Sequence, residues 1–278
     1  MLTPTAHDSF QKCGFVHCPG FLPEDKLVRA QAAIWQQLEK MGIWQTETGY
    51  LPKPMPTAIP DVAKHLRKVF KNHPALIDLV ADEIPQIVDE LLDGRITHPM
   101  MPYPQLLFTM PNAITWTVPH NAWHLDMPRL AEPGISGVQI FTFLERVTPS
   151  GGGTLVVAGS HHFFNEKREI RSQQLKRRLK RIPYFQTLMT EQSVDRNHFM
   201  TTPAMIDDVE VQVVELHGEP GDVYFTDLRL LHTTAPNATA TPRIMLTQRF
   251  LLEKTCKAIY GTPFPDHIAK NQSHENPL

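Results

Sequence analysis

The residues with the clearest potential for chemistry are a histidine and an aspartate two positions apart, His124 and Asp126. In a β-strand, residues i and i+2 project from the same face, so this spacing would place an imidazole and a carboxylate side by side. Pro119 and Pro128 bracket the segment and disfavour a helix. In an extended segment, the two side chains provide half of a divalent-metal site.

Two other interpretations of this segment compete with a metal site. His120 and His124 have the four-residue spacing of a helical zinc pair, but Asn121 stands where metalloproteases carry a glutamate. The chain has 14 histidines, so a His-x-Asp sequence can also arise by chance as an ordinary hydrogen-bonded surface pair. The pair alone is therefore weak evidence.

A third candidate ligand, His232, ends a turn, a strand and a short apolar run that begin at Pro220. A lone histidine in that position is ordinarily a core residue. Together with His124 and Asp126 it completes a set of two histidines and one carboxylate, the facial triad that binds non-haem Fe(II) and leaves positions open. Two open positions can take a bidentate 2-oxo acid, and one can take O₂.

Arg243 follows His232 and begins another strand-like segment. Its guanidinium suits the far carboxylate of a 2-oxo acid, because the two groups pair in a two-bonded fork. The alternative is an ion pair with an acid at the rim, such as Asp227. Arg249 lies at an even offset from Arg243 and therefore nominally on the same face, which makes it the natural control for any role of Arg243.

Strand-like segments dominate from residue 103 onward. They alternate with a period of two and are separated by Gly, Pro and Asn turns, which indicates a β-sandwich or barrel. On the first of them, Gln105 and Thr109 share a face, so both are candidates to line the site, with ordinary packing as an equal alternative. The expected strands are residues 105–109, 137–144, 154–157, 209–216, 222–225 and 244–250.

Helical spacing precedes the strands, with apolar residues recurring at near-helical intervals within residues 8–40 and again over 61–93. A length of 278 residues with 41% apolar residues allows one large domain or two small ones. We expect a single domain over residues 1–278. A mainly helical preface at 8–100 is followed by a barrel at 103–253, which a basic insertion at 164–200 interrupts.

Composition narrows the classes of function. The 27 Lys and Arg residues balance 29 Asp and Glu residues, so the chain lacks the global basic excess of a nucleic-acid-binding protein. Cys13, Cys18 and Cys256 are too scattered for a disulfide framework or a cysteine-rich zinc site, which favours a reducing, cytoplasmic setting. The amino terminus does not resemble a secretory signal. Prolines and polar residues interrupt the uncharged stretch 100–123, so we expect no membrane span.

A basic run covers residues 166–181, with eight basic and two acidic residues. Such runs are usually solvated helix faces. The functional alternative is a lid or rim that attracts an anionic substrate, such as a carboxylate, a phosphate or a CoA ester. No series of aromatic residues accompanies the run, which disfavours nucleic acid as a partner.

At the candidate metal ligands and the segments around them, the sequence resembles the phytanoyl-CoA dioxygenase family of Fe(II)- and 2-oxoglutarate-dependent oxygenases. The resemblance extends over nearly the whole chain. Ala158 stands where the family usually has proline, and Leu125 replaces a commoner polar residue, but neither change removes a ligand. Four motifs occur in family order: an opening strand at 14–22, Trp123–Asp126, a glycine turn, strand and Ser-His block at 150–162, and the run from Gly221 through His232 and Asn237 to Arg243.

The resemblance implies a mainly β, α+β fold, a double-stranded β-helix or jelly-roll, cupin-like barrel with flanking helices. It implies that His124, Asp126 and His232 bind Fe(II), and that Thr234 and Arg243 hold 2-oxoglutarate. The expected enzyme is a dioxygenase that oxidises a small organic substrate with O₂ and releases succinate and CO₂. Family members that halogenate have a small residue in place of Asp126, so hydroxylation is favoured.

Two rival classes remain at this stage. A non-catalytic, cupin-like barrel that binds a small molecule would have little use for the complete set of ligands and arginine. A zinc-dependent hydrolase would work without O₂ and 2-oxoglutarate. His161 and His162, in the glycine block, are expected to lie at the surface or behind the ligands rather than to bind metal.

Overall fold

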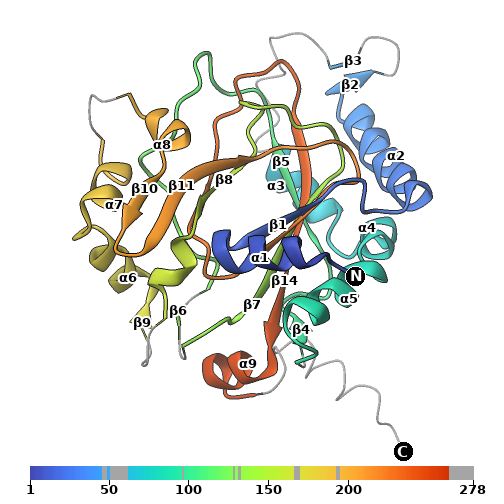
Figure 1. Ribbon diagram of the computed structural model, residues 1–278. Coiled ribbons are helices and arrows are strands. Elements are labelled where there is room, and N and C mark those ends of the chain that lie inside the picture. Colours follow the sequence, from blue (N-terminus) through green and yellow to red (C-terminus); the bar gives the residue numbers. More distant parts are fainter. Residues whose placement is uncertain are drawn as a thin grey trace, which may run out of the picture.

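The computed structural model describes residues 1–45, 49–50, 62–95, 97–127, 129–130, 133–165, 170–191 and 195–262 (Figure 1). The helices are α1 (Pro4–Cys13), α2 (Glu24–Lys40), α3 (Val62–Val69), α4 (Pro74–Leu79), α5 (Glu83–Leu91), the 3₁₀ helix η1 (Ser160–Phe163), α6 (Ser172–Leu179), α7 (Pro183–Leu188), α8 (His198–Thr201) and α9 (Glu253–Tyr260). The strands are β1 (Phe15–Cys18), β2 (Trp44–Gln45), β3 (Gly49–Tyr50), β4 (Thr97–Pro99), β5 (Gln105–Thr109), β6 (Arg129–Leu130), β7 (Gly137–Phe143), β8 (Thr154–Ala158), β9 (Ile170–Arg171), β10 (Ala204–Ile206), β11 (Val209–Leu216), β12 (Val223–Asp227), β13 (His232–Thr234) and β14 (Arg243–Leu252).

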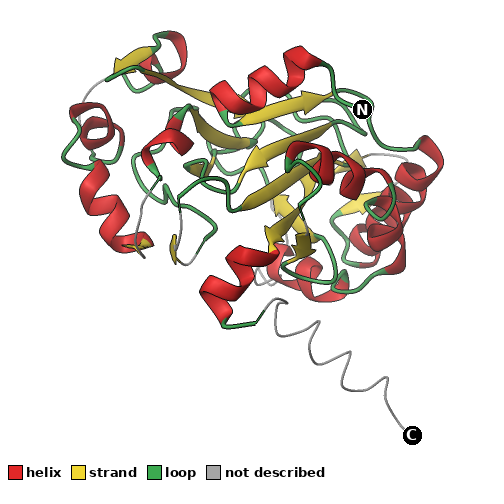
Figure 2. Cartoon of the chain, turned by 60° about the horizontal axis from the view of Figure 1, so that its bottom comes forward, coloured by secondary structure: helices red, strands yellow, loops and turns green. Residues whose placement is uncertain are grey.

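Two antiparallel sheets form the centre of the fold. The larger has the order β1-β12-β7-β14, and both β4 and β5 pair with β14; the smaller has the order β10-β11-β8-β13. Neighbouring strands within each sheet are mostly far apart along the chain, as in a jelly roll. Figure 2 shows the strands between helices on both sides. The predicted mainly β jelly-roll fold with flanking helices is confirmed.

Apolar side chains fall into three main layers that follow the alternation of the strands. One layer packs α1 to α5 against the outer face of the larger sheet, for example at Ile140 and Leu246. A second fills the space between the sheets and includes Phe143 and Met245. The third packs α6 to α8 against the outer face of the smaller sheet. Every second residue of a strand therefore faces the barrel interior. The residues between them, on the opposite face, pack against helices.

The helical region expected over 61–93 is three separate helices, α3, α4 and α5. The chain leaves helical geometry at Asn72, which has a left-handed φ of 61°. His73 is extended, as expected for a residue that precedes a proline, and Pro74 opens α4. The apolar periodicity continued across this break, which is why the spacing alone did not separate the helices.

The glycine turn at 150–153 leads into β8 and brings it close to the end of the neighbouring strand β11. Gly153 approaches the backbone so closely that a Cβ at this position would lie 2.2 Å from the carbonyl oxygen of Leu216. Only glycine fits that approach, which lets β8 pair with β11 from its first residue.

The segment that carries His124 and Asp126 is less regular than expected. Instead of a full strand, it forms an isolated antiparallel bridge between His124 and His232. The predicted alternation nevertheless holds, because Trp123 and Leu125 are buried in the apolar layer beneath α6 to α8. The two polar side chains consequently face the other way.

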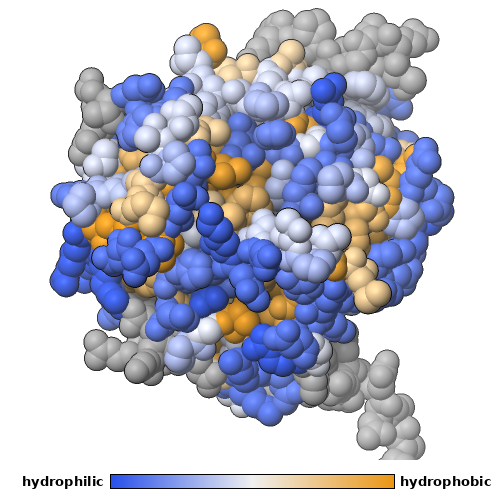
Figure 3. Space-filling model, in the orientation of Figure 1, coloured by the Kyte–Doolittle hydropathy of each residue, from blue (hydrophilic) through white to orange (hydrophobic). Residues whose placement is uncertain are grey.

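The described part of the basic insertion contains β9, α6, α7 and α8. Residues 166–169 of the basic run lie outside the described residues. No helix among the described ranges is long and apolar enough to cross a membrane. Figure 3 shows a face covered largely by polar residues, with apolar residues visible in several separate areas.

Replacement of Trp123 by alanine should destabilise the protein by about 3–5 kcal/mol, the usual cost of removing a large buried aromatic side chain. Trp123 is 2% exposed, and its indole N–H donates to the carbonyl of Pro119 at 2.9 Å. The measurement is urea unfolding of Trp123→Ala beside Ile114→Ala, which removes a fully exposed side chain and should change stability by about 0.5 kcal/mol or less. Equal losses would contradict this packing role.

Candidate functional site

Three potential metal ligands converge from distant parts of the chain: His124, Asp126 and His232 each contribute a ligand atom within 4.8 Å of the others. Nε2 of His124 lies 3.5 Å from Oδ1 of Asp126, and Nε2 of His232 lies 3.4 Å from Oδ2. The backbones of the two histidines exchange hydrogen bonds of 2.9 and 3.0 Å. This bridge joins the two segments directly at the ligand positions.

Both imidazoles are oriented by the backbone. Nδ1 of His124 bonds the carbonyl of Ala122 at 2.7 Å, and Nδ1 of His232 bonds the carbonyl of Leu230 at 2.9 Å. A carbonyl can only accept, so each Nδ1 carries a proton and each Nε2 is directed at the Asp126 carboxylate. A proton on Nε2 lets the imidazole donate to Asp126, and release of that proton exposes the lone pair that a metal ion requires.

Two residues of the larger sheet hold the Asp126 carboxylate. Arg249 donates to Oδ2 through Nε at 2.8 Å and Nη2 at 2.5 Å, and Gln139 donates through Nε2 at 2.7 Å. Arg249 and Gln139 are direct partners across β14 and β7. Oδ2 thus accepts from three N–H groups, two of Arg249 and one of Gln139, while Oδ1 faces His124.

The charges around the cluster keep the Asp126 carboxylate ionised. Burial works against the charged form, but hydrogen bonds with His124 and His232 and the charge of Arg249 hold the pKa of Asp126 well below its usual range. The interaction with Asp126 in turn raises the pKa of His124. A carboxylate that remains charged is a competent metal ligand.

Arg243 occupies a buried position on the face of β14 that also carries Arg249. It is 4% exposed, and Nη2 donates to Oγ1 of Thr109 at 2.7 Å. Nε has no hydrogen-bond partner, and Arg243 forms no ion pair with any residue in the described ranges. Burial lowers the pKa of Arg243 to about 10, so the guanidinium is still charged at neutral pH. The alternative pairing with Asp227 does not occur, because Asp227 binds Arg229 at 2.7 Å.

The other candidates from the sequence occupy different settings. Thr109 binds Arg243 directly, whereas Gln105 is half-buried and lies opposite Thr247 in the β5–β14 pairing. The side chain of Thr234 is exposed at the end of β13. Neither Gln105 nor Thr234 makes a side-chain hydrogen bond within the described part of the chain, so both remain open to a ligand.

The histidine pair of the glycine block lies apart from the cluster. His161 is buried, with Nε2 bonded to the carbonyl of Gln11 at 3.0 Å, and burial lowers its pKa to about 4. His162 is exposed. Among the described residues, neither belongs to a group that could hold a metal ion.

Sequence reasoning missed Gln139 and left Arg249 as a control. The even offset of Arg249 from Arg243 did signal that both face inward. Nothing in the sequence signalled Gln139, because its position opposite Arg249 depends on the register between β7 and β14.

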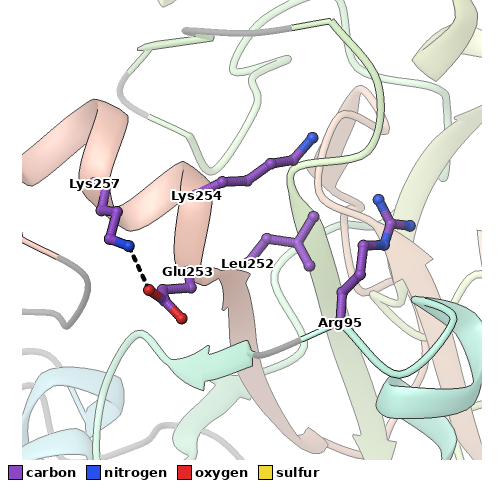
Figure 4. Close-up of a pocket in the computed structure, with 5 residues that line it drawn as sticks. All are labelled: Arg95, Leu252, Glu253, Lys254 and Lys257. Atoms are coloured by element: carbon purple, nitrogen blue, oxygen red, sulfur yellow. Dashed lines mark ion pairs between the residues drawn. The ribbon is translucent and has the colours of Figure 1, made fainter.

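A hollow of about 300 Å³ lies elsewhere, beside the start of α9. It is lined by Arg95, Leu252, Glu253, Lys254 and Lys257, and Lys257 binds Glu253 at 2.6 Å (Figure 4). In Figure 4 the side chain of Leu252 lies between those of Lys254 and Arg95, and Lys257 points toward Glu253. None of the triad residues lines it, so it is separate from the candidate metal centre.

Comparisons with known proteins agree with this site. The sequence model of the phytanoyl-CoA dioxygenase (PhyH) family matches residues 10–245. No curated protein matches the chain in sequence. Similar solved structures include the non-haem α-ketoglutarate-dependent carbocyclase SnoK from nogalamycin biosynthesis, with a TM-score of 0.56, 20% identity and coverage of 91% of this chain and 85% of that one.

Two further structures share the fold. EctD from S. alaskensis gives a TM-score of 0.53 at 16% identity, covering 91% of this chain and 78% of its own. AviO1 from Streptomyces viridochromogenes Tue57 gives 0.51 at 18% identity, covering 90% and 96%. At these identities the likeness is one of fold.

Loss of Arg249 should destabilise the metal-free protein, because Asp126 would keep a buried charge with fewer donors. Replacing Arg249 by methionine preserves much of the side-chain volume and should cost about 1–3 kcal/mol. The two side chains are only 19% and 16% exposed. Urea unfolding would measure the loss.

The matched control is Arg146→Met, which breaks the pair with Glu219 whose side chains are 68% and 61% exposed. An exposed pair of this kind contributes about 0–1 kcal/mol. If Arg249→Met and Arg146→Met lose the same free energy of unfolding, Arg249 does not hold Asp126 in solution in the way that the structure shows.

Proposed function

Because the chain belongs to the phytanoyl-CoA dioxygenase family of Fe(II)- and 2-oxoglutarate-dependent oxygenases, we propose that it hydroxylates a small organic substrate and releases succinate and CO₂. The observation that carries the proposal is the convergence of His124, Asp126 and His232 on the same barrel interior as an unpaired, buried Arg243. The three cysteines of the chain are free thiols, which fits a reducing, cytoplasmic setting.

The donor set fits Fe(II). Two imidazole nitrogens and one carboxylate oxygen form the ligand combination of non-haem iron oxygenases. Nε2 of His124, Nε2 of His232 and Oδ1 of Asp126 would be the ligand atoms, since Oδ2 is already bonded by Arg249 and Gln139. Fe(II) held by these atoms would supply the chemistry through which 2-oxoglutarate and O₂ react.

Arg243 would hold the far carboxylate of 2-oxoglutarate. Its buried guanidinium has one donor group, Nε, without a partner. A buried charge without a counterion is unfavourable, and a carboxylate that accepts two parallel bonds from the guanidinium would satisfy it. Thr109 fixes Nη2 of the arginine. Thr234 and Gln105 are the further side chains proposed to contact the co-substrate.

Hydroxylation is proposed over halogenation because of how Asp126 is held. A halide needs a vacant place at the metal, which a small residue at this position provides. Here the carboxylate fills that place, and Arg249 and Gln139 hold it in one orientation. The chain's own contribution to the reaction is therefore to position two co-substrates and to leave the remaining space for the substrate.

Replacement of Asp126 by alanine should abolish succinate formation from 2-oxoglutarate while the barrel stays folded, because the residue belongs to an open metal site. The assay supplies Fe(II), 2-oxoglutarate, ascorbate and O₂, and circular dichroism monitors folding. Undiminished succinate formation in a folded Asp126→Ala protein would remove Asp126 from the metal site. Turnover of a substrate without O₂ or 2-oxoglutarate would instead indicate a hydrolase.

Replacement of Arg243 by alanine should weaken 2-oxoglutarate binding about ten- to hundred-fold, since a charged hydrogen bond contributes about 1.5–3 kcal/mol. Iron binding should change little. Anaerobic titration of the Fe(II)-loaded protein, followed by the metal-to-ligand absorbance, would measure both.

Arg249→Ala is the control, because its guanidinium is committed to Asp126 rather than left open. It should disturb iron binding more than co-substrate affinity. An unchanged 2-oxoglutarate affinity in Arg243→Ala would overturn the assignment of Arg243. So would equal losses of affinity in the two variants.

A further inference from the structure

The side-chain amide of Gln139 has a fixed direction. Its Nε2 lies 2.7 Å from Oδ2 of Asp126, an oxygen that also accepts from the guanidinium of Arg249. An ionised carboxylate can only accept, so Gln139 must turn its N–H group, and not its amide oxygen, toward Asp126. Because Gln139 is 2% exposed, the partners of its amide are groups of the protein.

The second proton of the same amide nitrogen is bonded to Thr247. Nε2 of Gln139 lies 3.1 Å from Oγ1 of Thr247, and Oγ1 donates to the backbone carbonyl of Ile140 at 2.8 Å. That carbonyl can only accept, so the hydroxyl proton of Thr247 is directed at Ile140 and a lone pair of Oγ1 receives the N–H of Gln139. Both protons on Nε2 are therefore committed, one to Asp126 and one to Thr247.

Thr247 lies where solvent has little access. It is 3% exposed and stands on β14, which runs beside β7 (Figure 1), opposite Phe141 and two residues before Arg249. Without Oγ1, the second N–H of Gln139 would lose its acceptor in a buried setting, which is unfavourable. Rotation of the amide toward another acceptor would withdraw the other N–H from Asp126. The hydroxyl of Thr247 therefore bears on the orientation of the carboxylate.

A second buried threonine separates this role from ordinary packing. Thr226 of β12 is 2% exposed, and its hydroxyl donates to the backbone carbonyl of Gln139 at 2.9 Å. Thr226 and Thr247 thus each donate to a backbone carbonyl of β7 from a buried position. Of the two, Thr247 is the one that also accepts from the side-chain amide of Gln139. The pair differs in the one contact that leads to Asp126.

We propose that Thr247 is a positioning residue for the candidate metal ligand Asp126 and that it acts through Gln139. By accepting the second amide proton, Thr247 keeps the first one on Oδ2 of Asp126. Oδ1 then stays directed at His124, where it is available to Fe(II). This inference rests on the proposed function and deepens it, because it assigns a role in metal binding to a residue that is not itself a ligand.

The test compares Thr247→Val with Thr226→Val, because valine keeps the shape of threonine and replaces the hydroxyl by a methyl group. Gln139→Leu and the double variant Gln139→Leu/Thr247→Val complete a cycle. Each metal-free protein is titrated with Co(II), an air-stable divalent ion whose visible absorbance responds to its ligands. Urea unfolding of the metal-free proteins measures the stability of each variant separately.

The two threonine variants should lose similar free energies of unfolding but differ in metal binding. Affinity for Co(II) should fall about three- to ten-fold in Thr247→Val, the range for one hydrogen bond, and stay within about two-fold of wild type in Thr226→Val. The visible spectrum of bound Co(II) should change in Thr247→Val alone of the two. In the Gln139→Leu background, adding Thr247→Val should weaken Co(II) binding by less than about two-fold, because residues that act through one another are not additive.

Thr247→Ser keeps the hydroxyl, and it should bind Co(II) as the wild-type protein does. It also serves as the test if Thr247→Val does not fold, since a loss of Co(II) affinity in folded Thr247→Ser would assign the effect to packing of the methyl group and overturn the inference.

Other outcomes would also overturn the inference. These are an unchanged Co(II) affinity in Thr247→Val, an equal loss in Thr226→Val, or additive losses in the double variant. Failure of the proposed function has a separate signature, because the wild-type protein would then bind no Co(II) at His124, Asp126 and His232, before any comparison of threonine variants.

Discussion

The Asp126 carboxylate is the point on which the rest of the site depends, since it is a mostly buried charge that only the closed barrel can satisfy. Its donors come from both sheets: His232 stands on the smaller sheet, and Gln139 and Arg249 stand on the larger one. A buried carboxylate that loses its partners is strongly unfavourable. Formation of the candidate metal site and closure of the two sheets are therefore coupled, although the acid itself lies outside any regular strand.

The backbone positions the two imidazoles of the candidate site. The imidazoles are fixed by backbone carbonyls, which move only if the chain moves, and the two histidine segments bond to each other. Ligands that are held before metal arrives lose little conformational freedom on binding it. The apolar layer between the sheets, with Phe143 and Met245 in it, keeps the surrounding strands at a fixed separation.

Local pattern was enough to predict the parts of the site that depend on neighbours in sequence. The same-face pairing of His124 and Asp126 follows from their spacing, and the inward direction of Arg249, though not its contact with Asp126, follows from its even offset from Arg243 along β14. The local sequence pattern could not predict contacts that depend on the register between strands far apart in the sequence. Gln139 meets Asp126 because β7 pairs with β14 in one particular alignment, and Arg249 meets it because the loop before β6 returns to the barrel interior. The break at Asn72 was hidden for a different reason, because apolar spacing continued through a left-handed residue.

The two arginines of β14 illustrate how one strand can serve two purposes. They face the same interior, but six residues of extended chain separate their Cα atoms by about 20 Å, so they cannot bond the same carboxylate. Arg249 lies where the protein supplies its own acid, and its charge is neutralised by Asp126. Arg243 lies deeper, where Thr109 offers a hydroxyl but no charge. Within the described residues this guanidinium has no acidic partner, and a buried charge in that state is costly to the folded protein, which supports the role proposed for Arg243 in binding a carboxylate from outside the chain.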